Sequence, residues 1–438
     1  MEFSSQPPRI MHIDINSCFA TVEQQANPLL RCKPVAVAAY VKDYGCILAA
    51  SREAKSFGVK TGMRVKEGRA IVPHLIVLPP DPPKYRAVNR KLLAILQSYT
   101  AHVSVESIDE IVVGFKNAPS LNNESRIMNH EKKQKTIIHD SQFIIQETAS
   151  IMQGIAREIK ERIRLEIGEW ITVSCGIAPN RYLAKVASSL QKPDGLVAIT
   201  KENIVQIFAH MQLTDFCGIK SGNAGRLRAA GITTPLAFFR ASSTELKRAF
   251  RAITGYQWWL RLHGYEDGVM YQEFEKVREG DQKSFGQSYM LGTPYSPHYP
   301  RLWQILTQLV MKMGRRLRHD GFVAYGVGIS LMHDGYTHWH TQEKRTSPMV
   351  TDMDFYYAMR DLLERAPQKL VKLLAVYAYA LIRDTGLQPS LFAEENRKRE
   401  VVRALDAIQD RFGDFIIHPA RMINMEQKVL DRIAFGHV

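Results

Sequence analysis

Several features that mark other classes of protein are missing from this sequence. No apolar run approaches the roughly 20 residues that span a bilayer, and the opening residues have neither the basic nor the apolar region of a secretory signal. The five cysteines form no Cys-x-x-Cys pair and are odd in number, which is typical of reduced thiols rather than of disulfide bridges or a zinc site. We therefore expect a cytoplasmic protein with no membrane partner.

A polyanion partner is the one class that the composition favours. The chain has 438 residues, 45% of them hydrophobic and 23% charged, as in soluble globular proteins of about three domains. Its formal net charge is +14. Residues 283–385 carry 13 basic and 8 acidic residues, a local surplus of +5, and no stretch of the chain is a basic tail. A polyanion would therefore bind on folded surface.

The first third of the chain combines patterns typical of strands with patterns typical of helices. Alternation of apolar and polar residues predicts strands, and apolar residues every three to four positions predict amphipathic helices. The predicted strands are 11–15, 103–113 and 170–177, and the predicted helices are 19–25, 85–99 and 144–164. This order predicts an α+β layout, in which the polar residues 116–142 form an exposed excursion.

The remainder of the chain divides at a charged segment without periodicity. Residues 200–265 are helical in pattern, and residues 269–282 are the best linker candidate. A second α/β unit follows, whose clearest elements are a helix at 302–318, a strand at 322–331 and an apolar run at 370–382.

Three acidic residues form the strongest local signal for chemistry. Asp14 lies on one predicted strand, and the adjacent Asp109 and Glu110 interrupt another. Neighbouring side chains of a strand point to opposite faces, so this pair converges only at a bend, with help from the strand that carries Asp14. Acids among apolar sheet positions are costly unless a cation neutralises them, and paired divalent ions serve phosphoryl and nucleotidyl transfer. A solvated strand end explains the acids equally well.

A family resemblance favours the metal. Four motifs, in this order, resemble the Y-family translesion DNA polymerases of the bacterial DinB/UmuC type. They are Asp14–Glu23 (DINSCFATVE), Gly45–Met63 (GCILAASREAKSFGVKTGM), Ser107–Glu110 (SIDE) and Gly176–Gly195 (GIAPNRYLAKVASSLQKPDG). The resemblance covers about residues 9–392, with 116–142 as an insertion.

The resemblance implies an α+β, multidomain, right-hand polymerase. Its parts would be a ferredoxin-like palm, small fingers, a helical thumb with a helix-hairpin-helix, an α/β little finger and a C-terminal tail. In this chain they would be residues 1–19 and 79–190 (palm), 20–78 (fingers), 191–268 (thumb, with 213–235 as the helix-hairpin-helix), 269–282 (linker), 283–385 (little finger) and 386–438 (tail).

The resemblance also assigns the three acids. Asp14, Asp109 and Glu110 would hold two Mg²⁺ ions, with Mn²⁺ able to substitute, and the backbone carbonyl of Ile15 would reach one of them. One ion would activate the primer 3′-hydroxyl and the other would hold the triphosphate. Asn16 stands where many relatives have a second Asp, a position that the family does not require as a ligand.

Nucleotide contacts follow from the same motifs. Phe19 occupies the place of the steric gate, whose ring excludes a 2′-hydroxyl; a plain core phenylalanine is the alternative. The nucleotide-binding residues implied by the resemblance are Ser17, Cys18, Phe19, Arg52, Lys55 and Lys185. Relatives often have Tyr at position 52 and Arg at position 55. A solvated helix lysine is the alternative for Lys185.

DNA contacts are expected on the thumb and the little finger. The Gly-rich segment around Gly218 would present backbone N–H groups to a phosphate, although a plain helix connection is the alternative. The candidate DNA-binding residues are Gly218, Lys220, Gly222, Lys283, Ser284, Trp339, Lys344 and Arg345. His338 and His340 share a face, but with no third ligand nearby they do not indicate a metal site.

A short segment after the little finger resembles the peptide by which bacterial polymerases dock on the sliding clamp (β). Gln388 would fill a polar pocket, and Leu391 with Phe392 a hydrophobic one. An accessory subunit is a further candidate partner. The function implied is template-directed, low-fidelity DNA synthesis past damaged bases in the SOS response to DNA damage. A non-catalytic clamp-binding adaptor and a DNA-binding protein with a vestigial polymerase fold are the alternatives, and the three intact acids favour the enzyme.

Overall fold

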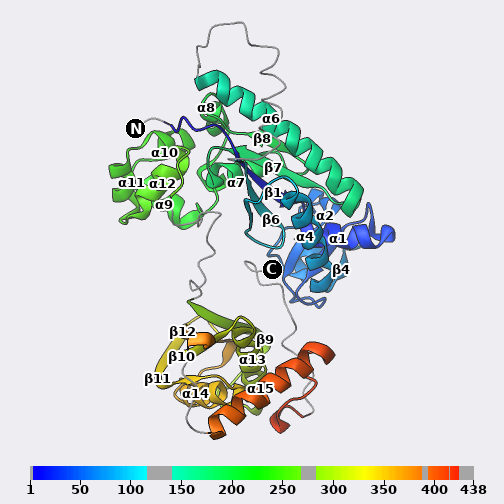
Figure 1. The fold of residues 1–438 in the computed structure, drawn as a ribbon, viewed down its shortest axis with the longest axis vertical. Coiled ribbons are helices and arrows are strands. Elements are labelled where there is room, and N and C mark those ends of the chain that lie inside the picture. Colours follow the sequence, from blue (N-terminus) through cyan, green and yellow to red (C-terminus); the bar gives the residue numbers. More distant parts are fainter. Residues whose placement is uncertain (1–2, 116–140, 268–282, 387–392, 414, 424–438) are drawn as a thin grey trace. The chain divides into compact units, whose positions relative to one another are not determined.

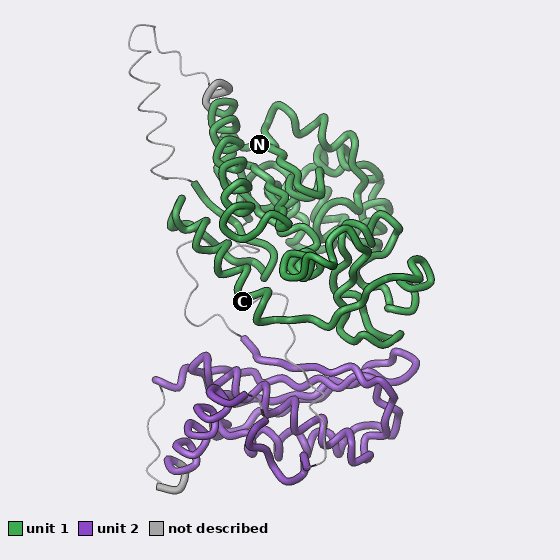
Figure 2. The backbone as a smooth tube through the Cα atoms, turned by 90° about the vertical axis from the view of Figure 1, so that its right-hand side faces the viewer, with its two compact units in different colours: residues 1–277, 432–438 green, residues 278–431 purple. Residues whose placement is uncertain are grey.

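The chain folds into two compact units. The computed structural model describes residues 3–115, 141–267, 283–386, 393–413 and 415–423 (Figure 1). Unit 1 comprises residues 1–277 and 432–438, and unit 2 comprises residues 278–431 (Figure 2). The predicted linker, 269–282, lies outside the described residues, and so does the predicted excursion, 116–142, except for residues 141 and 142, which begin a helix (α6, Ser141–Arg162).

A five-stranded sheet organises the first part of unit 1. Its strand order is β5-β6-β1-β7-β8, and β1 pairs antiparallel with both of its neighbours. The strands are β5 (Val103–Val105), β6 (Glu110–Gly114), β1 (Ile10–Ile15), β7 (Val173–Ala178) and β8 (Leu196–Ala198). The predicted strand 103–113 is therefore a hairpin, because its two halves pair with each other across a turn that contains Asp109.

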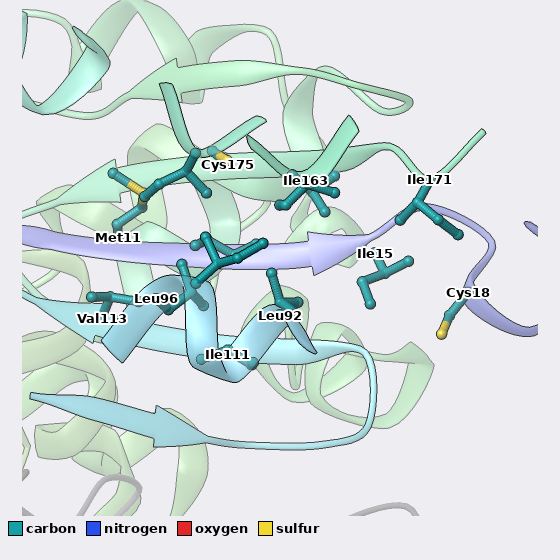
Figure 3. Packing of buried hydrophobic residues seen from close by; sticks show 14 of the residues in the cluster. Met11, Ile15, Cys18, Leu92, Leu96, Ile111, Val113, Ile163, Ile171 and Cys175 are labelled. Atoms are coloured by element: carbon teal, nitrogen blue, oxygen red, sulfur yellow. The ribbon is translucent and has the colours of Figure 1, made fainter. Parts of the chain in front are cut away.

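Helices cover both faces of this sheet because the central strand is buried on both faces. Met11, Ile13 and Ile15 alternate along β1 and pack with residues of α4 (Pro82–Gln97) and α6 (Ser141–Arg162), as Figure 3 shows for part of the cluster. The helix α7 (Arg181–Leu190) contacts β1 and β7 and shares a second core with the following helices. Asn180 caps α7 by accepting a hydrogen bond from the backbone of Leu183.

Two smaller subdomains complete unit 1. A three-stranded sheet, β3-β2-β4, is built from β2 (Val35–Ala38), β3 (Ile47–Ala50) and β4 (Ile76–Leu78) and packs with α2 (Arg52–Ser56) and α3 (Val65–Ile71). The helix α1 (Cys18–Ala26) connects β1 to this sheet. The predicted helical region is confirmed as α8 (Ile204–Ala209), α9 (Ser221–Ala229), α10 (Pro235–Arg240), α11 (Ser243–Phe250) and α12 (Thr254–Leu262).

Unit 2 is a four-stranded antiparallel sheet with helices on one face. The strand order is β11-β10-β12-β9, and α13 and α14 share a core with the sheet. The elements are β9 (Ser284–Tyr295), α13 (Pro300–His319), β10 (Phe322–His333), β11 (His338–Met349), α14 (Asp352–Glu364) and β12 (Val371–Arg383). The helix predicted at 302–318, the strand at 322–331 and the apolar run at 370–382 are confirmed as α13, β10 and β12.

Residues expected to form a charged tail pack on the outer side of α13. Asp406 of helix α15 (Ala393–Phe412) forms an ion pair with the guanidinium of Arg318, with 2.7 Å between carboxylate oxygen and guanidinium nitrogen. Asp352 of α14 pairs with the same guanidinium at 2.8 Å. The Arg318 side chain is only 10% exposed. Farther along, Arg421 lies over the ring of Tyr356, 3.7 Å from its centroid. The segment therefore adds a third layer to unit 2.

Substituting Asp406 by Ala is expected to destabilise unit 2. The variant leaves the buried Arg318 with one carboxylate instead of two, and breaking a buried pair costs about 2 to 3 kcal/mol when part of the compensation remains. Asp410→Ala is the matched control, because Asp410 is 58% exposed where it pairs with Arg315, and its loss should cost under about 1 kcal/mol. Urea denaturation compares the two. Equal losses would argue against the third layer.

Candidate active site

The three predicted acids meet at one end of the central strand. In the antiparallel ladder of β1 and β6, Asp14 lies opposite Glu110. The backbone N–H of Ile15 donates to the carbonyl of Asp109 at 2.9 Å, which ties the hairpin turn to the same strand. Ser107 shapes the turn, because its hydroxyl accepts from the backbone N–H of Glu110 at 3.1 Å. The sheet register thus brings together residues that are almost 100 positions apart in the sequence.

Each carboxylate is held by a different protein partner. Lys192 donates to Asp14 at 2.5 Å, Lys185 donates to Glu110 at 2.6 Å, and the hydroxyl of Ser107 donates to Asp109 at 2.5 Å. Within the described residues, no three His, Cys, Asp or Glu side chains form a group that could hold a metal ion as they stand. The side chains of all three acids are turned toward separate donors, which reduces the repulsion between the like charges.

Burial disfavours the charged form of the Asp14 carboxyl. Asp14 is only 9% exposed, and this burial raises its pKa to about 6, although Lys192 lowers it and Glu110 and Asp109 add to the increase. The Lys192 ammonium alone does not offset the burial, so additional cationic charge beside Asp14 would stabilise its carboxylate form. Carboxylate and carbonyl oxygens are the donors that Mg²⁺ and Mn²⁺ prefer. The donor set therefore fits divalent cations of this kind.

Asn16 has a structural part in the site. Its amide donates to the hydroxyl of Ser174 at 2.8 Å, and its side-chain oxygen accepts from the backbone of Asp194 at 2.7 Å and from Thr172 at 3.1 Å. An aspartate lacks the N–H₂ donor of the first contact. The amide therefore joins β1, β7 and the loop that carries Lys192.

Phe19 belongs to the first turn of α1 and is buried in the core. Its ring is 3% exposed and stacks on Tyr85 of α4, with ring centroids 4.6 Å apart. The Tyr85 hydroxyl donates to Glu23 at 2.8 Å, which fixes the stacked ring. Ser17 precedes the helix in the left-handed conformation, with φ of 52°, and Cys18 is buried. The structure thus places the predicted gate residue in a buried, stacked aromatic pair.

The predicted triphosphate contacts in the small sheet subdomain lie on one short helix. Arg52 and Lys55 belong to α2, which Ser51 caps by accepting from the backbone of Ala54 at 3.3 Å. Burial lowers the pKa of Lys55, Lys192 lowers it further, and Asp14 opposes both effects. Lys55 therefore lies close enough to Asp14 and to Lys192 for its charge to interact with both.

Sequence reasoning missed Lys192. The residue belongs to a quoted motif, in the Lys-Pro-Asp-Gly run after α7, but only Lys185 was singled out there. The structure gives the two lysines different acids, Lys185 to Glu110 and Lys192 to Asp14. The available signal was the lysine that follows a capped helix and precedes a Pro-Asp-Gly turn.

The predicted phosphate-binding connection in the helical subdomain has one position whose backbone conformation favours glycine. Gly218 adopts a φ of +87°, and a Cβ there would lie 3.3 Å from the ring of Trp258. Gly222 lies in α9, where a Cβ would meet no atom within 4 Å, so its backbone conformation does not require glycine. Lys220 is the residue before the first turn of α9.

The open face of the sheet in unit 2 carries only some of the predicted residues. Lys344 lies opposite Gly326, and Ser284 lies opposite Tyr379, on the face away from the helices. Trp339 packs against the core, and Arg345 pairs with Glu343 and Asp361, so neither belongs to that face.

Two tyrosines cover glycines on the open face. A Cβ on Gly326 would lie 2.4 Å from the ring of Tyr379, and one on Gly328 would lie 2.2 Å from the ring of Tyr377. The rings therefore lie flat over bare backbone. Lys283 is exposed at the start of β9. The predicted docking residues Gln388, Leu391 and Phe392 lie outside the described residues.

Comparison with known proteins gives consistent relatives for both units. Residues 13–189 match the model of the impB/mucB/samB family, and residues 282–391 match the model of its C-terminal domain. The chain is 32% identical to DNA polymerase IV of Moorella thermoacetica, over 94% of this chain and 95% of that one. It is 28% identical to DNA polymerase IV 1 of Bacillus subtilis, over 98% and 96%.

Solved structures with the same fold cover most of the chain. A Y-family DNA polymerase chimera of Dbh and Dpo4 aligns with a TM-score of 0.67 and 22% identity, over 85% of this chain and 99% of that one. An insertion ternary complex of Dbh DNA polymerase aligns over the same shares, with a TM-score of 0.53 and 22% identity. None of the helices in the described part of the chain is long and apolar enough to cross a membrane.

Proposed function

This chain belongs to the impB/mucB/samB family of DinB-type Y-family polymerases, and from that membership we propose that it copies DNA with low fidelity by two-metal nucleotidyl transfer. It is a DNA-directed DNA polymerase of the translesion type. The single observation that carries the mechanism is the β1–β6 register, which sets Asp14 opposite Glu110 with Asp109 beside them. The right-hand fold supplies the palm for this site.

The metal would be held by the acids at the end of β1. We assign Asp14, Asp109 and Glu110, with the carbonyl of Ile15, as the ligands of two divalent ions, which we take to be Mg²⁺. When bound, such ions activate the attacking hydroxyl and neutralise the triphosphate. The support is the buried carboxyl of Asp14 and the purely oxygen donor set.

The lysines around the acids have two separate roles. Lys192 and Lys55 interact through their like charges, and a triphosphate between them would relieve that repulsion. We therefore add Lys192 to Arg52 and Lys55 as a triphosphate contact. Lys185 is bound to Glu110, so we propose that it orients that carboxylate as well as contacting the nucleotide.

The remaining assignments concern selectivity and partners. The buried Phe19–Tyr85 pair suits a gate that excludes ribose, because a ring packed against its neighbour has little room to yield to a 2′-hydroxyl. Duplex DNA is proposed to bind the Gly218 connection of the thumb and the open face of the little finger with Lys344 and Ser284. The sliding clamp is a proposed partner on the sequence of residues 388–392 alone.

Metal removal and acid should both stop the reaction. A chelator should abolish primer extension, and added Mg²⁺ should restore it. Because the carboxyl of Asp14 has a pKa of about 6, protons compete with the ion below that pH, and affinity for Mg²⁺ should fall by about tenfold for each further pH unit. Calorimetric titration of the protein with MgCl₂, without DNA or nucleotide, measures this dependence directly.

Lys192→Met tests the cause of that pH dependence. Lys192 lowers the pKa of Asp14, so its loss should move the midpoint of Mg²⁺ binding to higher pH. Lys60→Met removes an exposed lysine of the fingers and should leave the midpoint unchanged. If the wild type and both variants have the same midpoint, Asp14 is not a ligand of the bound metal.

A further inference from the structure

Helix α7 lies directly on the palm sheet at one position. A Cβ on Gly176 of β7 would lie 2.0 Å from the carbonyl oxygen of Ala184 and 2.2 Å from the backbone nitrogen of Ser188. Only glycine permits so close an approach of helix backbone to strand. His12 of β1 is the direct neighbour of Gly176 in the sheet and therefore borders the same contact.

His12 makes one hydrogen bond from a fully buried position. Its side chain is 1% exposed, and its Nδ1 lies 3.1 Å from the hydroxyl of Ser188. No described residue supplies a hydrogen-bond partner for Nε2. The Ser188 hydroxyl donates its one proton to the carbonyl of Lys185, at 2.9 Å. The bond with His12 therefore needs the proton of the ring on Nδ1, so that Ser188 accepts it.

The same tautomer explains why Nε2 of His12 has no hydrogen-bond partner among the described residues. With the proton on Nδ1, Nε2 is a bare lone pair, whereas the other tautomer would bury an N–H donor without an acceptor. Orphaned buried N–H groups are rare and costly. Both nitrogens are therefore consistent with the same tautomer.

We propose that His12, with its proton on Nδ1, is a positioning residue that fixes helix α7 to strand β1 and so holds Lys185 against Glu110. The strand carries His12 and Asp14, and the helix carries Ser188 and Lys185. The chain of contacts ends at the 2.6 Å bond between Lys185 and Glu110. The inference rests on the proposed role of Glu110 in the active site.

The tautomer is the first test, and it does not depend on polymerase activity. Two-bond ¹H–¹⁵N correlation spectra of the full chain, labelled on its histidine rings, distinguish Nδ1–H from Nε2–H, and His12→Asn identifies the signal by its disappearance. We expect Nδ1–H in the wild type and loss of that preference in Ser188→Ala. A wild-type ring protonated on Nε2 would overturn the proposal, even if the protein is an active polymerase.

Kinetics supply the second test. His12→Leu should lower kcat of primer extension by about tenfold, the equivalent of about 1.4 kcal/mol, with KM for the nucleotide within about twofold. His12→Asn retains a donor near the position of Nδ1 and should recover most of kcat. Ser188→Ala should resemble His12→Leu, and the double variant should add little to either.

His333→Leu is the matched control for these variants. His333 is buried to 2% exposure in unit 2, and no described residue bonds either of its ring nitrogens, so its replacement removes a buried imidazole away from the palm. We expect kcat to remain unchanged. If His12→Asn is no better than His12→Leu, or if the two substitutions at His12 and Ser188 are additive, the proposed contact does not position the helix.

Discussion

Substituting Asp109 by Asn and Glu110 by Gln together is expected to reduce primer extension by at least about 10³-fold. Both replacements keep the shape of the side chains but remove the charge that would hold a divalent ion. Glu110 is opposite Asp14 in the sheet, and Asp109 is tied to the same strand through the N–H of Ile15, so the pair forms the larger part of the cluster. Single-nucleotide incorporation under saturating Mg²⁺ measures the loss.

The fold should survive this double substitution. Removing two like charges beside Asp14 relieves part of the repulsion that raises its pKa, and the hydroxyl of Ser107 still has an oxygen at position 109 to bond. The melting temperature is therefore expected to stay close to that of the wild type. A double variant that keeps activity within about tenfold would contradict the assignment of the metal ligands.

Phe19→Ala is expected to raise the use of ribonucleotides relative to deoxyribonucleotides by about 10² to 10³-fold, because the ring that we propose to block the 2′-hydroxyl is gone. The residue is also part of the palm core, where it stacks on Tyr85. Loss of a buried phenylalanine costs about 3 to 5 kcal/mol of stability. The ratio of kcat/KM for matched ribonucleotide and deoxyribonucleotide separates selectivity from stability.

Phe115→Ala distinguishes a gate from a core residue. Phe115 is fully buried in the same hydrophobic cluster, so its substitution should destabilise the palm by a similar amount. It carries no proposed contact with nucleotide, and sugar selectivity should not change. If both variants lose selectivity equally, general loosening of the palm would be the better explanation for Phe19→Ala.

Local sequence patterns were sufficient to predict where the three acids lie, but not which side chains contact them. Apolar alternation placed Asp14 on a strand, and the interruption at Asp109 and Glu110 predicted a bend, which is confirmed as the β5–β6 hairpin. The role of Asn16 and the contact of Lys192 with Asp14 depend on how β1, β7 and the loop after α7 meet, and no single segment contains that information.

Unit 2 shows the same limit. Trp339 and Lys344 lie on opposite faces, and which residue lies on which face is decided by the pairing of β11 with β10, in which Gly326 is opposite Lys344. A shift of one residue would exchange the two faces. The packing of α15 depends on Arg318 meeting Asp406, 88 residues later, so the sequence alone suggested a separate charged tail.

Template-directed incorporation by the full-length protein tests the central claim most directly. The wild type is given a primed template, Mg²⁺ and one deoxynucleotide at a time, with each of the four template bases in turn at the first unpaired position. We predict extension that follows the template base, with frequent errors, and that disappears in the Asp109→Asn, Glu110→Gln double variant. No extension by the wild type, or extension that ignores the template, would contradict the account.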